Sequence, residues 1–461
     1  MHFLLALILA QAAGPRTFRV DYFHTGTATE EHFSLDRLVL EPLAWAGNPA
    51  RPIDDTNSGK YLFEVRDRAT NRLLYSRGFS SIYSEWVDTP EAQSASRTFS
   101  ESFRFPRPDS PVQVILKKRD ARTNLFQEVW TILVDPHDQF VDDAKPPSAG
   151  ALIALQHKGD PAKKVDLLIL GDGYTVRERG KFEKDARRLI EVLFAHSPFK
   201  ERRDDFNVWG LCPAAAESGI SRPSTGVHKR SPVGATYDAF GSERYILTFA
   251  NRAFRDLASQ APYELVEILT NSNTYGGGGI FNLYSTVAAD SLWSSYVFVH
   301  EFGHHIAGLA DEYFTSESGL VPSSLRLEPW EPNVSATASL DKLKWAALVT
   351  PGVPLPTPWD EQGFIVWQNG VQQKRRAIRS ARRPESEMDA LFTAEKAEST
   401  RRLSSGKYAG VVGAFEGANY EARGYYRSQL DCIMFARDDV PFCAACKSAI
   451  ARIIDLDTSN N

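Results

Sequence analysis

Residues 291–313 read S-L-W-S-S-Y-V-F-V-H-E-F-G-H-H-I-A-G-L-A-D-E-Y, and this stretch decides the fold. It contains the pattern H-E-x-x-H, formed by His300, Glu301 and His304. Because helix residues four positions apart share a face, one helix can direct both imidazoles at a single metal ion. Gly308 accepts the left-handed backbone angles that end a helix, so we expect the helix to stop there.

The pattern predicts a catalytic zinc site. Neutral imidazole is a good zinc ligand, and catalytic zinc has three protein ligands and an open position for water. We predict one Zn²⁺ ion held by His300 and His304, with Asp311 as the third ligand because the chain can return to the metal after the helix ends. Glu312 and the distant Glu416 are the alternatives for the third ligand.

Glu301 and His305 have different predicted roles on the same helix. Zinc lowers the pKa of a bound water from 15.7 to about 7. Glu301 lies beside the first ligand, so it would act as general base, taking the water's proton and passing it to the leaving amine of a peptide. His305 lies about 100° around the helix from His304, so we expect it to pack or to form a hydrogen bond.

The first part of the chain has the alternation typical of β-strands. Apolar and polar residues alternate around positions 18–22, 61–65, 112–116 and 130–134. Period-two alternation marks half-buried strands, and several short strands at such spacing favour a small sandwich. We therefore expect a β-sandwich accessory domain over residues 16–140, followed by a polar, proline-rich boundary.

The pattern changes after that boundary. Residues 165–170, V-D-L-L-I-L, form a short apolar run, and a glycine turn and a helical pattern over 182–193 follow it. Strand, turn and helix in this order are typical of an α/β domain. The chain is therefore predicted to have an α+β multidomain fold, with a β-sandwich first and an α/β catalytic domain over residues 150–461.

The N-terminus favours export. An apolar run over residues 3–10 leads into Ala10-Gln11-Ala12, an A-x-A cleavage pattern, which predicts a signal peptide over residues 1–12 and a secreted or periplasmic protein. No later stretch has the ~18 apolar residues of a membrane helix, so we expect no transmembrane segment. The net charge of −5 and the pI of about 6.1 do not give the basic footprint of a nucleic-acid-binding protein.

The four cysteines leave two interpretations open. They are Cys212, Cys432, Cys443 and Cys446. An even number in an exported chain favours disulfides, although the sequence does not fix the pairing. The C-x-x-C pair with Cys432 nearby could instead form a structural zinc site, in which a cysteine-only ligand set would need Cys212 as its fourth member.

Residues 300–313, H-E-F-G-H-H-I-A-G-L-A-D-E-Y, resemble the site signature of the secreted zinc metallopeptidases named for immunoglobulin A cleavage. The resemblance extends over about residues 160–450, and the β-rich region before it is similar to the accessory domain of that family. It implies a metzincin-like zincin fold. Metzincins have H-E-x-x-H-x-x-G-x-x-H; here the glycine comes one residue later, at Gly308, and Asp311 replaces the last histidine.

The resemblance also implies roles for residues outside the helix. Met434 would lie in the Met-turn, a tight turn beneath the zinc. Tyr275 and the four glycines after it would lie near the substrate cleft, where glycine allows close backbone approach. Tyr426 and Arg427 are candidates to donate hydrogen bonds to the developing oxyanion.

These observations predict a secreted zinc-dependent endopeptidase with protein or peptide substrates. The resemblance implies host or extracellular proteins and glycoproteins, such as immunoglobulins, as substrates. A glycopeptide or cell-wall peptide is an alternative substrate for the same chemistry. The alternative from another class is a non-catalytic, zinc-containing protein that binds a surface glycan or protein, with the N-terminal domain as the recognition module. Intact His300, Glu301 and His304 favour the enzyme.

Overall fold

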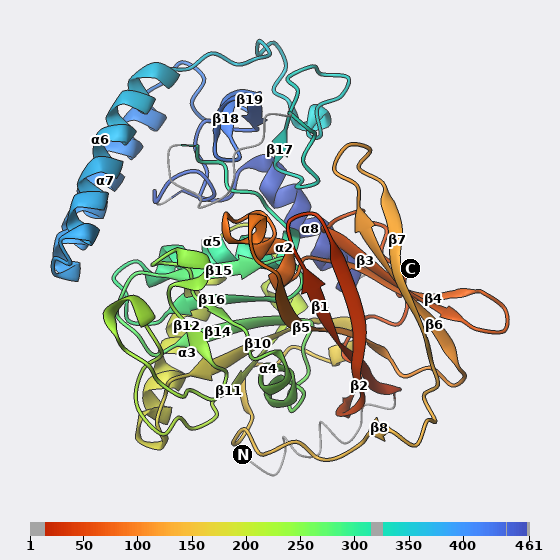
Figure 1. The fold of residues 1–461 in the computed structure, drawn as a ribbon. Coiled ribbons are helices and arrows are strands. Elements are labelled where there is room, and N and C mark those ends of the chain that lie inside the picture. The colour runs from red at the N-terminus through yellow and green to blue at the C-terminus, as the bar shows by residue number, and fades with distance from the viewer. Residues whose placement is uncertain (1–13, 315–325, 439, 459–461) are drawn as a thin grey trace.

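The N-terminal part of the computed structural model consists of two four-stranded β-sheets that pack face to face (Figure 1). The structure describes residues 14–314, 326–438 and 440–458, so the predicted signal peptide lies outside the described residues. One sheet has the order β5-β1-β2-β8 and the other the order β4-β3-β6-β7. The strands are β1 (Arg16–Gly26), β2 (Glu31–Ala44), β3 (Tyr61–Asp67), β4 (Leu73–Phe79), β5 (Arg97–Pro106), β6 (Val112–Arg119), β7 (Phe126–Val134) and β8 (Val141–Asp142).

Alternating apolar side chains of both sheets form one core. Phe18, Val20 and Tyr22 of β1 meet Phe63 and Val65 of β3 in a single hydrophobic cluster. The sequence pattern predicted strands at these positions, and the structure confirms them. Adjacent strands within each sheet are antiparallel, apart from the short parallel pair of β2 and β8.

The second part of the chain is an α/β region built on a six-stranded sheet with the order β15-β16-β14-β10-β11-β9. The four inner strands are parallel, and both edge strands are antiparallel to their neighbours. The strands are β9 (Ile153–Gln156), β10 (Val165–Asp172), β11 (Phe206–Leu211), β14 (Leu265–Thr270), β15 (Gly277–Ile280) and β16 (Tyr284–Ala288). A strand–turn–helix unit was predicted here, and β10 followed by α3 (Arg179–Leu193) confirms it.

Both faces of this sheet are covered, as the buried pattern of β10 requires. Leu167 and Ile169 belong to a cluster that contains apolar side chains of α3, α5 (Ser294–Ala307) and α8 (Ala444–Thr458). Leu168 and Leu170 point to the other face and join side chains of α4 (Asn251–Ala258) and of α2 (Ile82–Trp86) from the N-terminal part. The two parts therefore share a core, although two separate domains were expected. The predicted boundaries at 140 and 150 stay predictions.

Smaller elements complete the molecule. A three-stranded sheet contains β17 (Val334–Ser335), β19 (Glu421–Arg427) and β18 (Phe415–Ala418), and β12 (Ala235–Thr236) pairs with β13 (Leu247–Thr248). The long helices α6 (Glu361–Ser380) and α7 (Glu385–Ser404) form the hairpin seen at one side in Figure 1. Within the described parts of the chain, every helix is too short or too polar to cross a lipid bilayer.

Candidate metal centre

Helix α5 carries the histidine pair and ends where the sequence predicts. Gly308 follows its last residue with φ of 58°, and its N–H donates to the carbonyl of His304 at 3.0 Å. Glycine adopts this left-handed conformation without the steric cost that a side chain brings. The reversal sends residues 309–312 back along the helix, so that Asp311 returns to the two histidines.

Strand β15 packs closely against helix α5. A Cβ atom built on Gly279 would lie 2.2 Å from the carbonyl oxygen of Glu301 and 2.9 Å from Cβ of His304. Only glycine permits this approach of the strand to the helix backbone. The glycine run expected near a cleft thus forms the edge strand next to α5, and its outer side is partly paired with the segment around Tyr245.

Three side chains converge on one point between the helix and the segment that follows it. Nε2 of His300 and Nε2 of His304 are 3.2 Å apart, and Oδ1 of Asp311 lies 3.1 Å from the first and 3.4 Å from the second. Tetrahedral ligands at ~2.1 Å from a zinc ion are separated by about 3.4 Å. The spacing of these three atoms therefore fits one zinc ion.

The other polar atoms of the three side chains are held by the protein. Nδ1 of His300 donates to the carbonyl of Ile433 at 3.0 Å, and Nδ1 of His304 donates to the carbonyl of Leu309. Tyr420 donates its hydroxyl to Oδ2 of Asp311. These contacts orient the rings and the carboxylate, as the outer partners of metal ligands do. They leave both Nε2 atoms and Oδ1 directed at the shared point.

The charges at this point favour a cation. Burial alone disfavours the charged imidazole, but the Asp311 carboxylate outweighs it and raises the pKa of His304 to about 9. Burial likewise opposes the charged carboxylate, yet His304 and His300 hold the pKa of Asp311 well below its ordinary value. Since a metal needs unprotonated imidazole, protons and a divalent cation compete here, and metal affinity must fall as the pH falls.

The structure separates the three candidates for the third ligand. Asp311 lies between the histidines, whereas the adjacent Glu312 points to a different group of residues that contains three cysteines. Glu416 accepts hydrogen bonds from Arg423 and from the backbone N–H of Gly424, each at 2.9 Å. Of these three carboxylates, Asp311 is the one that lies with the histidine pair.

The other residues of the predicted site lie at different distances from the pair. Glu301 is half-buried on α5, and its Cγ atom lies against Gly277 of β15. Met434 is fully buried in the turn over residues 432–435, directly after Ile433, whose carbonyl binds His300. The turn on which Met434 lies is therefore part of the site's support.

The structure shows the surroundings of the oxyanion candidates, Tyr426 and Arg427, and of Tyr275. Arg427 is fully buried and donates to the backbone carbonyls of residues 416, 417 and 430. The hydroxyl of Tyr275 accepts from Arg437 at 3.3 Å, and its ring packs on Phe392 of α7. Tyr426 is half-buried and pairs with Ser335 on the small sheet. Arg427 is thus held inside the protein by backbone carbonyls, and its predicted role as an oxyanion donor stays a prediction.

Tyrosines that the sequence did not single out surround the histidine pair. Besides Tyr420, the Tyr296 hydroxyl lies 3.3 Å from Nδ1 of His300, and the Tyr313 ring is stacked on the His300 ring at 6.4 Å between centroids. Tyr296 precedes His300 by one helical turn, so the i, i+4 rule could have identified it. Tyr420 comes from a distant loop, and no local pattern indicates it.

His305 has the structural role expected for it. Its Nδ1 donates to the carbonyl of Ile280 in β15 at 3.1 Å, and its Nε2 accepts the N–H of Val266 in β14 at 3.1 Å. The neutral ring thus joins α5 to two strands of the sheet. The prediction that it packs or forms a hydrogen bond, and does not share the metal, agrees with this placement.

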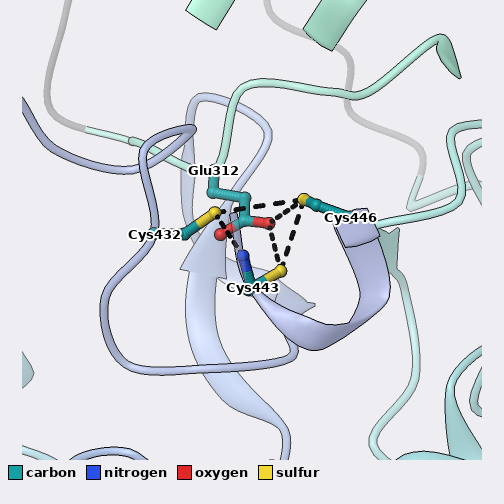
Figure 2. A group of neighbouring side chains, drawn as sticks. All are labelled: Glu312, Cys432, Cys443 and Cys446. Atoms are coloured by element: carbon teal, nitrogen blue, oxygen red, sulfur yellow. Dashed lines mark hydrogen bonds between the residues drawn. The ribbon is translucent and has the colours of Figure 1, made fainter. Parts of the chain in front are cut away.

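The expected disulfides are absent from the structure, in which all four cysteines are free. Cys212 lies at the end of β11 against Gly171, apart from the others. Cys432, Cys443 and Cys446 lie together and face the carboxylate of Glu312 (Figure 2). A cysteine-only set with Cys212 as its fourth member is therefore wrong, because Cys212 does not lie among the ligand atoms of this group, and Glu312 does.

Comparison with known proteins places the site in a family context. Residues 153–454 match the family model described as IgA Peptidase M64, and residues 10–131 match the one described as Peptidase M64 N-terminus. A search of the curated proteins found no match. The first range contains the histidine pair, Glu301 and Asp311, and the two ranges together confirm the resemblance stated from the sequence.

Proposed function

The chain belongs to the IgA peptidase M64 family, and we propose that it is a zinc-dependent endopeptidase with a metzincin-like catalytic domain. The observation that carries this proposal is the meeting of two Nε2 atoms and Oδ1 of Asp311 within 3.4 Å of one another. In this structure Oδ1 is buried and has no hydrogen-bond donor, so a cation would supply its missing partner.

His300, His304 and Asp311 would hold the zinc ion. Two nitrogens and one carboxylate oxygen form a ligand set of the catalytic type, which leaves the fourth position open. When bound, zinc polarises a carbonyl and makes water more acidic. The residues around the set have a separate task, which is to fix both rings and the carboxylate before substrate arrives.

Glu301 is the proposed general base. It follows His300 directly and belongs to the same helix, yet its carboxylate is not part of the three-residue group. It is half-buried beside β15, so its side chain is not closed off from solvent. There it would take a proton from the attacking water and return it to the amine that leaves.

Extracellular proteins are the proposed substrates. This rests on the predicted signal peptide and on the family's description, which names immunoglobulin A. The N-terminal sheets are proposed to assist recognition of a protein or glycan surface.

The test is Glu301→Gln in the purified protein. General acid–base catalysis contributes about 10²- to 10⁴-fold, so kcat on an unfolded generic protein should fall by that factor while the zinc content stays unchanged. Glu416→Gln is the matched control, since it removes a carboxylate that binds Arg423 outside the site. Unchanged proteolysis by Glu301→Gln would overturn the assignment, and a zinc-loaded wild type without proteolysis would favour the binding protein.

A further inference from the structure

A second group of metal-binding side chains lies beside the candidate catalytic centre. It comprises Glu312 and three cysteines, Cys432, Cys443 and Cys446, and is called here the cysteine–Glu312 cluster. All four side chains are buried, and one ligand atom from each lies within 4.8 Å of the others. Figure 2 shows the three sulfur atoms around the carboxylate.

The spacing fits a tetrahedral metal ion. Sγ of Cys446 lies 3.3 Å from Sγ of Cys443 and 3.9 Å from Sγ of Cys432. Oε1 of Glu312 lies 3.3 Å from the sulfur of each C-x-x-C cysteine. With zinc–sulfur bonds of about 2.3 Å and a zinc–oxygen bond of about 2.0 Å, sulfur atoms would be about 3.8 Å apart and sulfur and oxygen about 3.5 Å apart.

The burial of these groups favours a bound cation. Oε2 of Glu312 is buried without a hydrogen-bond partner, and Oε1 has one amide donor, Asn333, at 3.0 Å. A buried carboxylate is costly unless it is paired or binds a metal. The sulfur of Cys432 already accepts backbone N–H groups of Met434 at 3.4 Å and Cys443 at 3.2 Å, as a thiolate ligand would.

Disulfide pairing does not account for the cluster. Three thiols meet there, so any single disulfide leaves one cysteine and the carboxylate over. The fourth cysteine, Cys212, lies against Gly171 of β10 and Phe182 of α3, outside the group. Soft thiolates select zinc among the common divalent metals, and four buried protein ligands leave no open position for water.

We propose that the cysteine–Glu312 cluster binds a second zinc ion with a structural role. The proposal does not rest on peptidase activity, because the cluster's ligands are distinct from the histidine pair and from Asp311.

The cysteine–Glu312 cluster is connected to the candidate catalytic centre through two segments of the chain. Glu312 is covalently next to Asp311, and its N–H donates to the carbonyl of Met434 at 2.9 Å. Cys432 begins the turn whose Ile433 carbonyl orients His300. One ion in the cluster would therefore fix both the segment that brings Asp311 to the site and the segment that holds His300.

Zinc counting on the full chain tests the proposal. We expect two zinc ions per chain in the wild type and one in the double variant His300→Ala/His304→Ala. Adding Cys446→Ser to that variant should remove the remaining ion. Cys212→Ser is the matched control, because it removes a buried thiol outside the cluster and should keep both ions. A single zinc in the wild type that the histidine variant loses would overturn the proposal.

Two further measurements cover a variant that fails to fold. In the histidine double variant loaded with Co²⁺, thiolate ligands should give an intense sulfur-to-cobalt charge-transfer absorption, which the conservative variant Glu312→Gln should shift. The wild-type protein is unfolded without a reductant, a chelator is added to remove bound metal, and its thiols are then titrated. We expect four free thiols per chain. If only two free thiols were found and the charge-transfer absorption were absent, the cluster would contain a disulfide, and the zinc assignment would be wrong.

Discussion

Asp311 is the residue whose position decides whether the two histidines can share an ion. Its carboxylate is buried, and its two oxygens have different surroundings: Oδ1 faces the histidines and Oδ2 accepts the hydroxyl of Tyr420. The Tyr420 hydroxyl therefore fixes the rotation of the carboxylate. Without it, Asp311 could turn away from the shared point at little cost.

Tyr420→Phe should weaken metal binding. Loss of a partner of a metal ligand typically costs 10- to 100-fold in affinity, and we expect a change of that size in the zinc dissociation constant measured by chelator competition. Tyr22→Phe is the control, since it removes a tyrosine hydroxyl that donates to Glu101 at 2.9 Å, far from the site. Equal affinities of the Tyr420→Phe protein and the wild type would contradict this role.

Sequence spacing could predict one half of the site and not the other. His300, Glu301 and His304 follow from the 3.6-residue period of a helix, which is a local property. Asp311 follows less directly, since a glycine break allows a return without choosing between Asp311 and Glu312. Tyr420 meets Asp311 across 109 positions, and Cys443 meets Glu312 across 131. Such contacts depend on the packing of whole segments, which no spacing rule encodes.

At the scale of elements, α5 and β15 were predictable for different reasons. The helix has both an apolar face and a glycine end, so its existence and its end at Gly308 could be read from the sequence. The glycines of β15 indicated a close approach, but its partner, the backbone of Glu301, was visible only in the structure. Strands β2, β4 and β5 were not predicted individually, although β5 does alternate, with Phe99, Phe103 and Phe105 buried at every second position.

His24 connects three strands of the first sheet. It lies on β1, and its ring nitrogens are 3.1 Å from Glu101 on β5 and 3.0 Å from Glu31 at the start of β2. Burial opposes a charged ring, but Glu101 and Glu31 outweigh it and raise the pKa of His24. Burial also opposes a charged Glu31, yet His24 and Lys118 lower the pKa of that carboxyl to about 2.

These shifts define a pH window for stability. The stabilisation that comes from the raised pKa of His24 is complete below pH about 6.5 and is lost as the pH rises through the pKa of the folded state. The stabilisation that comes from the lowered pKa of Glu31 is complete above pH about 4.5 and is lost as the pH falls toward 2. The wild-type free energy of unfolding should therefore fall as the pH rises above about 6.5. His24→Gln should be less stable at pH 5.5 and should flatten this slope.

Urea unfolding at a series of pH values checks this expectation. His137→Gln serves as control, because His137 is 57% exposed beside Asp135 and should keep the wild-type slope when replaced. A His24→Gln protein with an unchanged slope would show that another group is responsible.

At the scale of the whole molecule, the two parts of the chain are joined by apolar and ionic contacts. Trp86 of α2 is fully buried in the cluster that contains Leu168 of β10 and Val266 of β14. In addition, Asp256 of α4 lies 3.0 Å from Arg37 of β2 and also binds the buried Arg19. Breaking either contact would leave apolar surface or charge exposed on both parts.

This shared core predicts that both parts unfold together. Trp86→Ala should cost about 3–5 kcal/mol, since it removes the largest buried side chain of α2. The loss should appear equally in tryptophan fluorescence, which reports on both parts, and in release of metal from the histidine site, because the sheet beneath α5 loses its cover. Leu133→Ala, at a position 59% exposed on β7, should change stability by less than about 0.5 kcal/mol. If the two signals separated, with only the fluorescence transition shifted in Trp86→Ala, the N-terminal sheets would be an independent unit and the shared cluster a mere contact surface.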